Sequence, residues 1–335
     1  MRTDDARALW YEAGGVASLH TEPLAARGAG SLLVRSLYSG VSRGTERLVL
    51  QGNVPAAEAA RMRCPFQHGD FPHPVKYGYQ AVGMVEDGPP AWRGRTVFAL
   101  HPHQTRFVMP VEAVVPVPDA VPARRAALAG NMETALNALW DAGAGPADRI
   151  TVVGAGLVGL LTAALAARLP GARVTVVDIE PARAPVAAMF GAAFRLPGEV
   201  EPEADIVFHA SASEAGLATA IAAAGYEARI VEMSWYGARA VNVALGGAFH
   251  SRRLSLVSSQ VGAVSPGRRA RWDNRRRLAA ALDLLADARL DALVTHEVAF
   301  EEAPARLPAL LAAGADALGI VLRYTPEQEC LHVFR

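Results

Sequence analysis

Val152-Val153-Gly154-Ala155-Gly156-Leu157-Val158-Gly159 is the stretch that decides the fold of this 335-residue chain. It begins in an apolar run and leads into a second one, so the pattern predicts a strand, a tight turn and a helix. In such a turn the first glycine permits the reversal, the second lets a ligand approach the backbone, and the third lets helix and strand pack closely. The free N–H groups at the start of the helix then face an anion. The motif therefore predicts a site for the pyrophosphate of a dinucleotide.

A second predicted strand, Arg173–Asp178, ends in an acid 19 residues after Gly159 (178 − 159). A carboxylate at this point accepts hydrogen bonds from ribose hydroxyls and repels a 2′-phosphate, so Asp178 favours NAD over NADP. Arg183, five residues later, is able to bind either ribose or phosphate, but we expect NAD. The cofactor-binding residues predicted from this region are Gly154, Gly156, Leu157, Val158, Gly159, Asp178 and Arg183.

Strands and helices alternate outward from this motif. Strands are predicted at 151–153, 173–178, 205–208, 229–233 and 254–257, and helices at 157–169, 181–190 and 214–224. Repeated β-α-β units with apolar strands predict a parallel, doubly wound sheet. Residues 150–167 carry no charge over 18 residues, the lower limit for a membrane-spanning helix, but the three glycines break them into a buried strand and a buried helix.

The chain before this sheet is turn-rich and strand-rich. Short strands are predicted at 31–36, 80–86, 96–100, 107–109 and 113–117, and a helix at 123–141. A basic run, 268–277, is predicted to open an amphipathic helix that ends near Arg289, and a strand, a helix and a strand follow at 292–298, 301–313 and 318–324. We place one domain at 123–261 and the other at 1–122 with 262–335, with the second boundary between 260 and 290.

Composition narrows the possible partners and location. The chain has 33 basic and 33 acidic residues, and a balanced chain lacks the basic surface that nucleic acid or an anionic membrane requires. Two cysteines are too few for a disulfide framework or a cysteine-rich zinc site. The first residues are acidic and no apolar segment follows them, so no secretory signal is recognised. We expect a cytoplasmic protein.

Three further segments carry a resemblance to a known family. They are Tyr38-Ser39-Gly40-Val41-Ser42-Arg43-Gly44-Thr45-Glu46, Tyr77-Gly78-Tyr79-Gln80-Ala81-Val82-Gly83 and Leu290-Asp291-Ala292-Leu293-Val294-Thr295-His296. With the dinucleotide motif near mid-chain, they resemble the medium-chain dehydrogenase/reductase superfamily over essentially the whole chain. The resemblance implies a fold class of α/β plus β: a GroES-like β-barrel catalytic domain, to which the outer segments belong, and a Rossmann domain.

The departures from that family concern its catalytic zinc. The cysteine ligand of the first segment is replaced by Ser42, or by Arg43 if the segment is gapped differently, and the histidine ligand by Tyr79. The third ligand position falls near Gly130 and Asn131, and the four-cysteine zinc lobe is absent. Catalytic zinc needs about three N, S or carboxylate ligands, so we expect no zinc.

The sequence of residues 39–48 and 102–110 looks most like that of a zinc-lacking branch of the superfamily, which includes 2-desacetyl-2-hydroxyethyl bacteriochlorophyllide a dehydrogenase. This similarity implies an NAD-dependent oxidoreductase acting on CH–OH groups, an alcohol dehydrogenase or ketone reductase with a small-molecule substrate on a larger scaffold. Without zinc, protein groups must hold the substrate oxygen and move its proton. The candidates are Tyr79, His103, Ser42 and Glu46. By resemblance, Arg43 lies against the pyrophosphate and Thr134 near the nicotinamide.

Alternatives remain at this stage. His103 is also interpretable as a solvent-facing loop histidine, and Ser42 and Glu46 as turn residues. A quinone or enone reductase needs only donors for an enolate oxygen. A catalytically inactive NAD(H)-binding scaffold or sensor, and a metal site built from other ligands, are also open. Apolar residues 255–257 are expected to pair edge to edge in a homodimer, mainly because this superfamily often does so.

Overall fold

The structure, a computed structural model, describes residues 5–325 and divides into two compact units. Unit 1 comprises the chain up to Gly130 together with the part from Leu282 onward, and unit 2 is Asn131–Ala281. The first predicted boundary lies at 122/123 and the second between 260 and 290, and the two units meet at 130/131 and 281/282.

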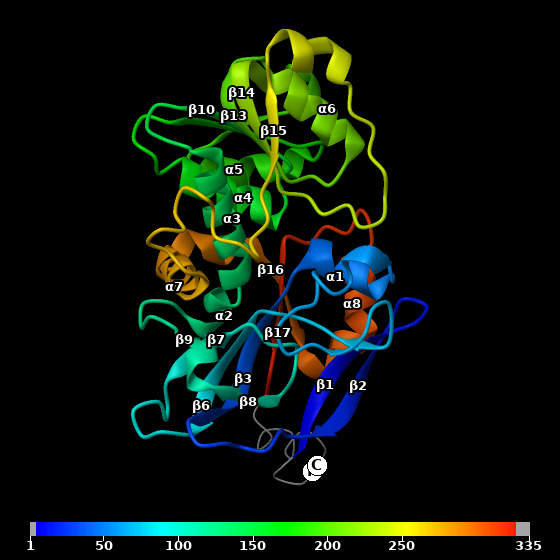
Figure 1. The fold of residues 1–335 in the computed structure, drawn as a ribbon, viewed down its shortest axis with the longest axis vertical. Helices are drawn as coiled ribbons and strands as arrows, with labels where there is room; N and C mark the ends of the chain where they lie inside the picture. Colours follow the sequence, from blue (N-terminus) through cyan, green and yellow to red (C-terminus); the bar gives the residue numbers. More distant parts are fainter. Residues whose placement is uncertain (1–4, 326–335) are drawn as a thin grey trace. The chain divides into compact units, whose positions relative to one another are not determined.

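Unit 1 is built on two sheets. The larger has the order β16-β17-β3-β6-β7-β9, with β8 also paired to β3, and the smaller has the order β2-β1-β5-β4. The strands of the larger sheet are β3 (Ser31–Val41), β6 (Ala81–Asp87), β7 (Thr96–Ala99), β8 (Arg106–Pro110), β9 (Val114–Pro116), β16 (Val294–Ala299) and β17 (Gly319–Arg323). Those of the smaller are β1 (Asp5–Glu12), β2 (Val16–Pro23), β4 (His68–Gly69) and β5 (Val75–Lys76). Figure 1 shows the late strand β17 beside the early strand β3, with which it pairs antiparallel.

The hairpin of β1 and β2 is absent from the sequence prediction. Its two strands pair over eight residues each and bury Leu9 and Tyr11 completely. Ala6 and Ala8 occupy the other buried positions of the strand, and alanine is depleted in strands. The alternation of apolar and polar residues was therefore weak in this segment, and only its pairing partners make it a strand.

Short helices in unit 1 carry the segments between strands. They are α1 (Arg43–Leu50), α2 (Ala123–Ala126) and α8 (Ala303–Leu311). One apolar core of the larger sheet packs Leu32, Val34, Val97, Phe107 and Met109, all at most 1% exposed. This core holds β3 in place, and β3 leads directly into α1 and the polar residues described below.

Unit 2 contains a six-stranded sheet of order β12-β11-β10-β13-β14-β15, and every neighbouring pair is parallel. The strands are β10 (Arg149–Val153), β11 (Arg173–Val177), β12 (Ala193–Arg195), β13 (Ala204–His209), β14 (Ala224–Glu232) and β15 (Ser255–Ser258). Helices α3 (Ala129–Ala142), α4 (Leu157–Ala166), α5 (Ala184–Met189) and α6 (Glu214–Ala223) separate or precede them. The predicted parallel, doubly wound sheet is confirmed.

Two predicted helices have different limits in the structure. Helix α7 (Asn274–Leu284) begins six residues after the predicted start at Arg268, because Asp273 precedes it and its side chain accepts a hydrogen bond from the Arg276 N–H at 2.7 Å. The helix predicted at 123–141 is broken into α2 and α3 between Ala126 and Ala129.

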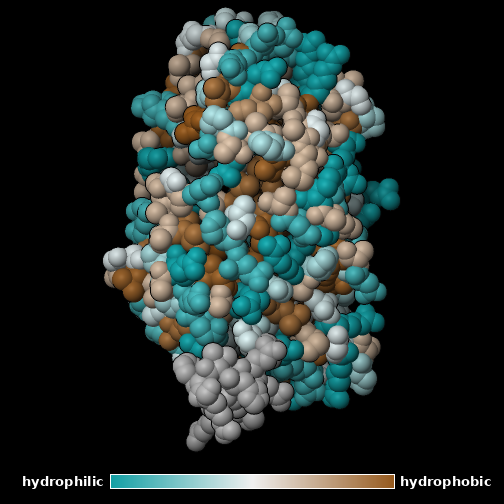
Figure 2. Space-filling model, turned by 180° about the vertical axis from the view of Figure 1, so that it is seen from behind, coloured by the Kyte–Doolittle hydropathy of each residue, from teal (hydrophilic) through white to brown (hydrophobic). Residues whose placement is uncertain are grey.

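The uncharged stretch at 150–167 forms β10, the glycine turn and α4. Within residues 5–325 no helix is long and apolar enough to cross a membrane. On the face shown in Figure 2, hydrophilic and hydrophobic residues are interspersed.

Candidate functional site

The glycine turn of unit 2 has the predicted geometry. Strand β10 ends at Val153, and Gly154 follows with a φ of +108°, a conformation that disfavours residues with a side chain. A Cβ on Gly159 would lie 1.9 Å from the Gly154 carbonyl oxygen, so this glycine is required for helix α4 to pack on the turn. Gly156 precedes α4 with no atom within 4 Å of where its Cβ would be. The space over Gly156 is what a phosphate at the helix N-terminus needs.

Asp178 is fixed against this turn. One carboxylate oxygen accepts the Ala155 N–H at 2.6 Å, and the other accepts the Glu180 N–H at 2.9 Å. Arg183 lies in the short 3-10 helix Pro181–Arg183 that follows. The acid therefore stands at the carboxyl end of β11, next to the turn, as expected for a ligand of ribose hydroxyls.

Thr134 lies on α3, one residue after a buried ion pair. The Glu133 carboxylate accepts a hydrogen bond from Arg277 Nε at 2.9 Å, and Arg277 also donates to Asn137 Oδ1 at 2.6 Å. Arg277 is 2% exposed. Burial raises the pKa of Glu133, although Arg277 opposes this. Glu133, a departure from the family pattern, is thus explained by packing within unit 2.

In unit 1 the predicted residue Glu46 is the centre of a buried hydrogen-bond network. It lies in the first turn of α1 and is completely buried. Its carboxylate accepts the Ser42 N–H at 2.7 Å, the Tyr11 hydroxyl at 2.5 Å and His103 Nε2 at 3.0 Å. Glu46 thereby fixes the turn that leads from β3 into α1.

His103 is not a solvent-facing histidine. It is completely buried, and its Nδ1 lies 2.7 Å from the hydroxyl of Ser39, which lies 2.8 Å from the hydroxyl of Tyr324. A Cβ on Gly78 would lie 2.9 Å from the His103 ring, so the imidazole packs directly behind the segment that carries Tyr79. The structure brings His103 and Glu46 together, but His103 is enclosed by protein groups.

Tyr79 is half-buried, and its hydroxyl donates to Thr45 Oγ1 at 3.5 Å. Burial raises the pKa of Tyr79 to about 12, although its hydrogen bonds with the Ser42 and Thr45 side chains oppose the change. Ser42 and Tyr79 are therefore neighbours, and Tyr79 is a hydrogen-bond donor at neutral pH. Cys64, the only cysteine within residues 5–325, donates its thiol to the Gly78 carbonyl at 3.3 Å, and burial raises its pKa to about 12.

The residues at the zinc-ligand positions do not fit a zinc ion. Arg43 donates to the backbone carbonyls of Ala317 at 2.9 Å and Ala312 at 3.2 Å. Tyr79 contributes a protonated phenol, and Gly130 has no side chain. Throughout residues 5–325, no group of three or more His, Cys, Asp or Glu side chains is arranged to hold a metal ion.

Sequence reasoning missed four members of this network: Tyr11, Ser39, Thr45 and Tyr324. Ser39 and Thr45 lie inside the family-like first segment, which is the one signal that pointed to them. Tyr11 lies on the unpredicted strand β1, and Tyr324 contacts Ser39 across 285 positions of sequence. No local pattern connects such distant residues.

A second group of polar side chains lies in unit 2, at the carboxyl ends of β13 and β14. We call it the β13–β14 cluster; its members are His209, Ser211, Ser213, Glu232 and Tyr236. His209 Nδ1 lies 2.7 Å from Glu232 Oε2, and His209 Nε2 lies 2.7 Å from the Ser211 hydroxyl. Ser211 in turn contacts Ser213 at 2.9 Å, and the Tyr236 hydroxyl donates to Glu232 at 3.1 Å. The sequence analysis did not identify this cluster.

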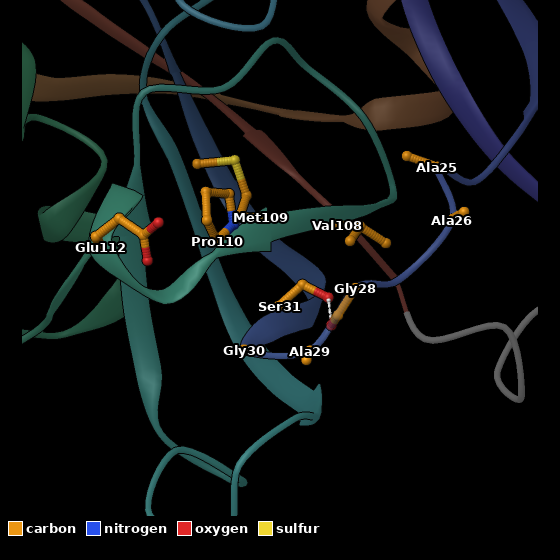
Figure 3. A pocket seen from close by; sticks show the side chains of 10 residues that line it. All are labelled: Ala25, Ala26, Gly28, Ala29, Gly30, Ser31, Val108, Met109, Pro110 and Glu112. Carbon is orange, nitrogen blue, oxygen red and sulfur yellow. Dashed lines mark hydrogen bonds between the residues drawn. The ribbon is translucent and has the colours of Figure 1, made fainter.

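Figure 3 shows a pocket in unit 1, with a volume of about 370 Å³. It is lined by Ala25, Ala26, Gly28, Ala29, Gly30, Ser31, Val108, Met109, Pro110 and Glu112. The Ser31 hydroxyl is bonded to the Gly28 carbonyl at 2.7 Å, so it does not face a ligand. Small side chains and a single carboxylate offer little chemistry, and the candidate site remains the set around Tyr79.

No protein-family model matches the chain. L-idonate 5-dehydrogenase from Escherichia coli K-12 has a similar structure, with a TM-score of 0.78 and 15% identity over 95% of this chain and 98% of that one. A short chain alcohol dehydrogenase, RspB, from E. coli CFT073 in complex with NADH gives 0.76 and 17% over 96% and 99%. A protein from Sinorhizobium meliloti 1021 assigned as a zinc-binding dehydrogenase, bound to NADP, gives 0.75 and 17% over 95% and 99%. The chain thus has the two-domain fold of these dehydrogenases, with a GroES-like unit 1 and a Rossmann unit 2.

Proposed function

We propose that the protein is an NAD-dependent oxidoreductase that interconverts a secondary alcohol and a ketone on a larger scaffold, without zinc. The observation that carries the proposal is the glycine turn with Asp178 held against it. The turn leaves space for a pyrophosphate, and a carboxylate in this position would select an unphosphorylated ribose. The dehydrogenases of similar fold, one of them bound to NADH, support the reaction class.

The residues of unit 2 would bind and orient the cofactor, which supplies the hydride when bound. Gly154 and Gly156 would let the pyrophosphate approach the turn, and the N–H groups of Leu157 and Val158 at the start of the helix would hold it, with Gly159 in the same helical turn. Asp178 would accept hydrogen bonds from the ribose, and Arg183 follows it in the chain. Thr134 near the nicotinamide, and Arg43 of unit 1 against the pyrophosphate, are proposed from the family resemblance.

The residues of unit 1 would hold the substrate oxygen. In carbonyl reduction this oxygen gains negative charge, and a positioned hydroxyl donor stabilises that charge. Tyr79 is protonated at neutral pH, and the Ser42 hydroxyl lies beside it. Glu46 fixes the Ser42 backbone, and His103 fixes Glu46, so these two position the donors.

Zinc independence is supported by the donor set. At the three positions where the resembled family carries its zinc ligands, this chain has a serine or arginine, a tyrosine and a glycine or asparagine. The pKa of the tyrosine is raised to about 12. Zinc binds thiolates, neutral imidazoles and carboxylates. Two hydroxyl donors take over the task of stabilising the oxygen in this proposal.

A second candidate is a quinone or enone reductase. The raised pKa of Tyr79 favours this candidate, because a protonated phenol is a hydrogen-bond donor and a poor base. An enolate oxygen needs only such donors. We favour the carbonyl reaction because the quinone and enone reductases that the chain resembles usually prefer NADPH and lack an acid at the position of Asp178.

The edge strand β15 ends the sheet order of unit 2, and we propose pairing of two such strands in a homodimer.

The test is NADH oxidation by the purified protein against two panels, ketones and aldehydes in one, quinones and enones in the other. Turnover confined to the first panel, with NADH used in preference to NADPH, is the expected result. Turnover confined to the second would replace the first candidate by the second. Binding of NADH without turnover on either panel would identify a cofactor-binding protein without this catalysis.

A further inference from the structure

Three side chains of the β13–β14 cluster form a hydrogen-bonded chain in the order Ser211, His209, Glu232. The Ser211 Oγ lies 2.7 Å from His209 Nε2, and His209 Nδ1 lies 2.7 Å from Glu232 Oε2. A hydroxyl against one imidazole nitrogen and a carboxylate against the other is the arrangement that activates a serine as a nucleophile in hydrolases of several unrelated folds. The proposed dehydrogenase reaction uses none of these three side chains.

Strand pairing brings the histidine and the carboxylate together. His209 and Glu232 end β13 and β14 and are register partners in this parallel pair, so their side chains leave the same face of the sheet. Burial tends to raise the pKa of Glu232, but hydrogen bonds from His209 and Ser234 outweigh it and lower the pKa. Glu232 is therefore ionised at neutral pH and only accepts hydrogen bonds, so His209 Nδ1 carries a hydrogen. The nitrogen that faces Ser211 is then Nε2, the one able to accept a proton.

Ser211 lies in the turn between β13 and α6, and this helix packs on both β13 and β14 (Figure 1). The next residue, Ala212, has a φ of +51°, which is uncommon for a residue with a side chain. Nucleophilic serines of α/β hydrolases lie in a strained strand-to-helix turn of this kind. A Cβ on Gly216, in the first turn of α6, would lie 2.0 Å from the Ser211 Oγ. The hydroxyl thus lies beside backbone N–H groups that have no partner within the helix, and such groups stabilise an oxyanion.

Solvent reaches the serine but not the histidine. Ser211 is half-buried, whereas the His209 side chain is 0% exposed and that of Glu232 is 15% exposed. The Tyr236 ring stacks on the imidazole, with 6.4 Å between the ring centroids. Enclosure protects the hydrogen bonds of His209 from competition with water. Because the hydroxyl is close to Gly216, there is room beside it for a small acyl group only.

We propose that unit 2 has a second activity, the hydrolysis of esters of small acyl groups, with Ser211 as the nucleophile. Ser211 Oγ forms a bond to the ester carbonyl carbon, its proton passes to His209 Nε2, and His209 gives this proton to the departing alcohol. Water then attacks the acyl group and loses a proton to His209, and release of the acid returns this proton to Ser211. Glu232 is a positioning residue that orients His209 in both steps. The inference is independent of the proposed dehydrogenase function, since neither step involves a cofactor.

The first experiment treats the full-length wild type with a fluorophosphonate, which forms a phosphorus–oxygen bond to an activated serine and loses fluoride. Peptide mass spectrometry then locates the label, and the expected position is Ser211. Hydrolysis of 4-nitrophenyl acetate, followed by the release of 4-nitrophenolate, is measured on the same protein. We expect hydrolysis above the rate in buffer.

Three variants test the roles of the side chains. Ser211→Ala is expected to lose both the label and the hydrolysis. Glu232→Gln keeps the shape of the side chain and removes its charge, so the rates of labelling and hydrolysis should fall at least about 100-fold. Ser259→Ala is the matched control, because Ser259 follows the neighbouring strand β15 and its hydroxyl donates to Asp141 at 2.7 Å. It should react like the wild type.

The outcomes separate this inference from the proposed function. A wild type that is not labelled at Ser211 overturns the inference, and this result needs no variant to fold. Hydrolysis at the wild-type rate in a folded Ser211→Ala protein, or in a folded Glu232→Gln protein, also overturns it, and thermal unfolding shows whether each variant is folded. Failure to oxidise NADH would refute the proposed function alone.

Discussion

Tyr79 is the residue on which the proposed chemistry depends most directly. Its Phe variant removes one hydroxyl donor from the substrate oxygen, and we expect kcat for carbonyl reduction to fall on the order of 100-fold. Because burial raises the pKa of Tyr79 to about 12, the phenol stays protonated up to about pH 10, and kcat of the wild type should show no loss from this group between pH 6 and 10.

Tyr38→Phe is the matched control for this prediction, since Tyr38 lies in β3 and takes no part in the network of Glu46. A Tyr79→Phe enzyme with the wild-type kcat, or a rate that follows a tyrosine titration near neutral pH, would remove Tyr79 from the mechanism.

Alanine substitutions at Gly156 and Gly159 test cofactor binding and folding separately. A Cβ on Gly156 meets no atom within 4 Å, so Gly156→Ala should fold normally while its methyl group occupies the space for the pyrophosphate. We expect at least about a tenfold weaker NADH affinity, measured by fluorescence, with an unfolding free energy within about 0.5 kcal/mol of wild type. Gly159→Ala, whose Cβ would lie 1.9 Å from a carbonyl oxygen, should be unstable instead. Unchanged NADH affinity in Gly156→Ala would place the cofactor elsewhere.

At the scale of elements, Arg277 joins α7 to α3. It donates to Glu133 and Asn137 on α3, and to the Ala263 carbonyl at 3.1 Å in the segment before α7. Arg277→Met leaves the Glu133 carboxylate buried without its cation, and we expect the free energy of unfolding, from urea titration, to fall by about 3 kcal/mol or more. Arg276→Met on the exposed side, where the guanidinium stacks on Trp272, should cost less than about 1 kcal/mol. Equal losses in both variants would contradict this account.

Element boundaries show which sequence signals were decisive. The glycine turn was predictable because its backbone conformation and close packing restrict Gly154 and Gly159 to one residue type, so the signal is local. The start of α7 was predicted at Arg268 from its charge pattern, although Asp273 is a typical residue to precede a helix. The capping residue was the better signal, because it satisfies a backbone N–H that a charge pattern does not.

At the scale of the whole molecule, the folds of the two units were predictable from the sequence, but the buried hydrogen-bond networks within them were not. The sequence indicated that Glu46 and His103 are functional candidates, yet their burial depends on Tyr11, Ser39 and Tyr324 from three separate strands or strand ends. The β13–β14 cluster escaped prediction for the same reason, since His209 and Glu232 meet only through strand pairing across 23 positions of sequence. Hydrogen bonds between distant residues follow from topology, which periodicity does not specify.

The central claim is carbonyl reduction by NADH without a metal ion. The most direct measurement is kcat/KM for the best ketone, made on protein whose zinc content is determined before and after exhaustive chelation and after zinc is added back. The account predicts the same kcat/KM in all three samples, whatever their zinc content, because the donors are Tyr79 and Ser42. A loss of activity that follows the loss of zinc and is restored by zinc would contradict it.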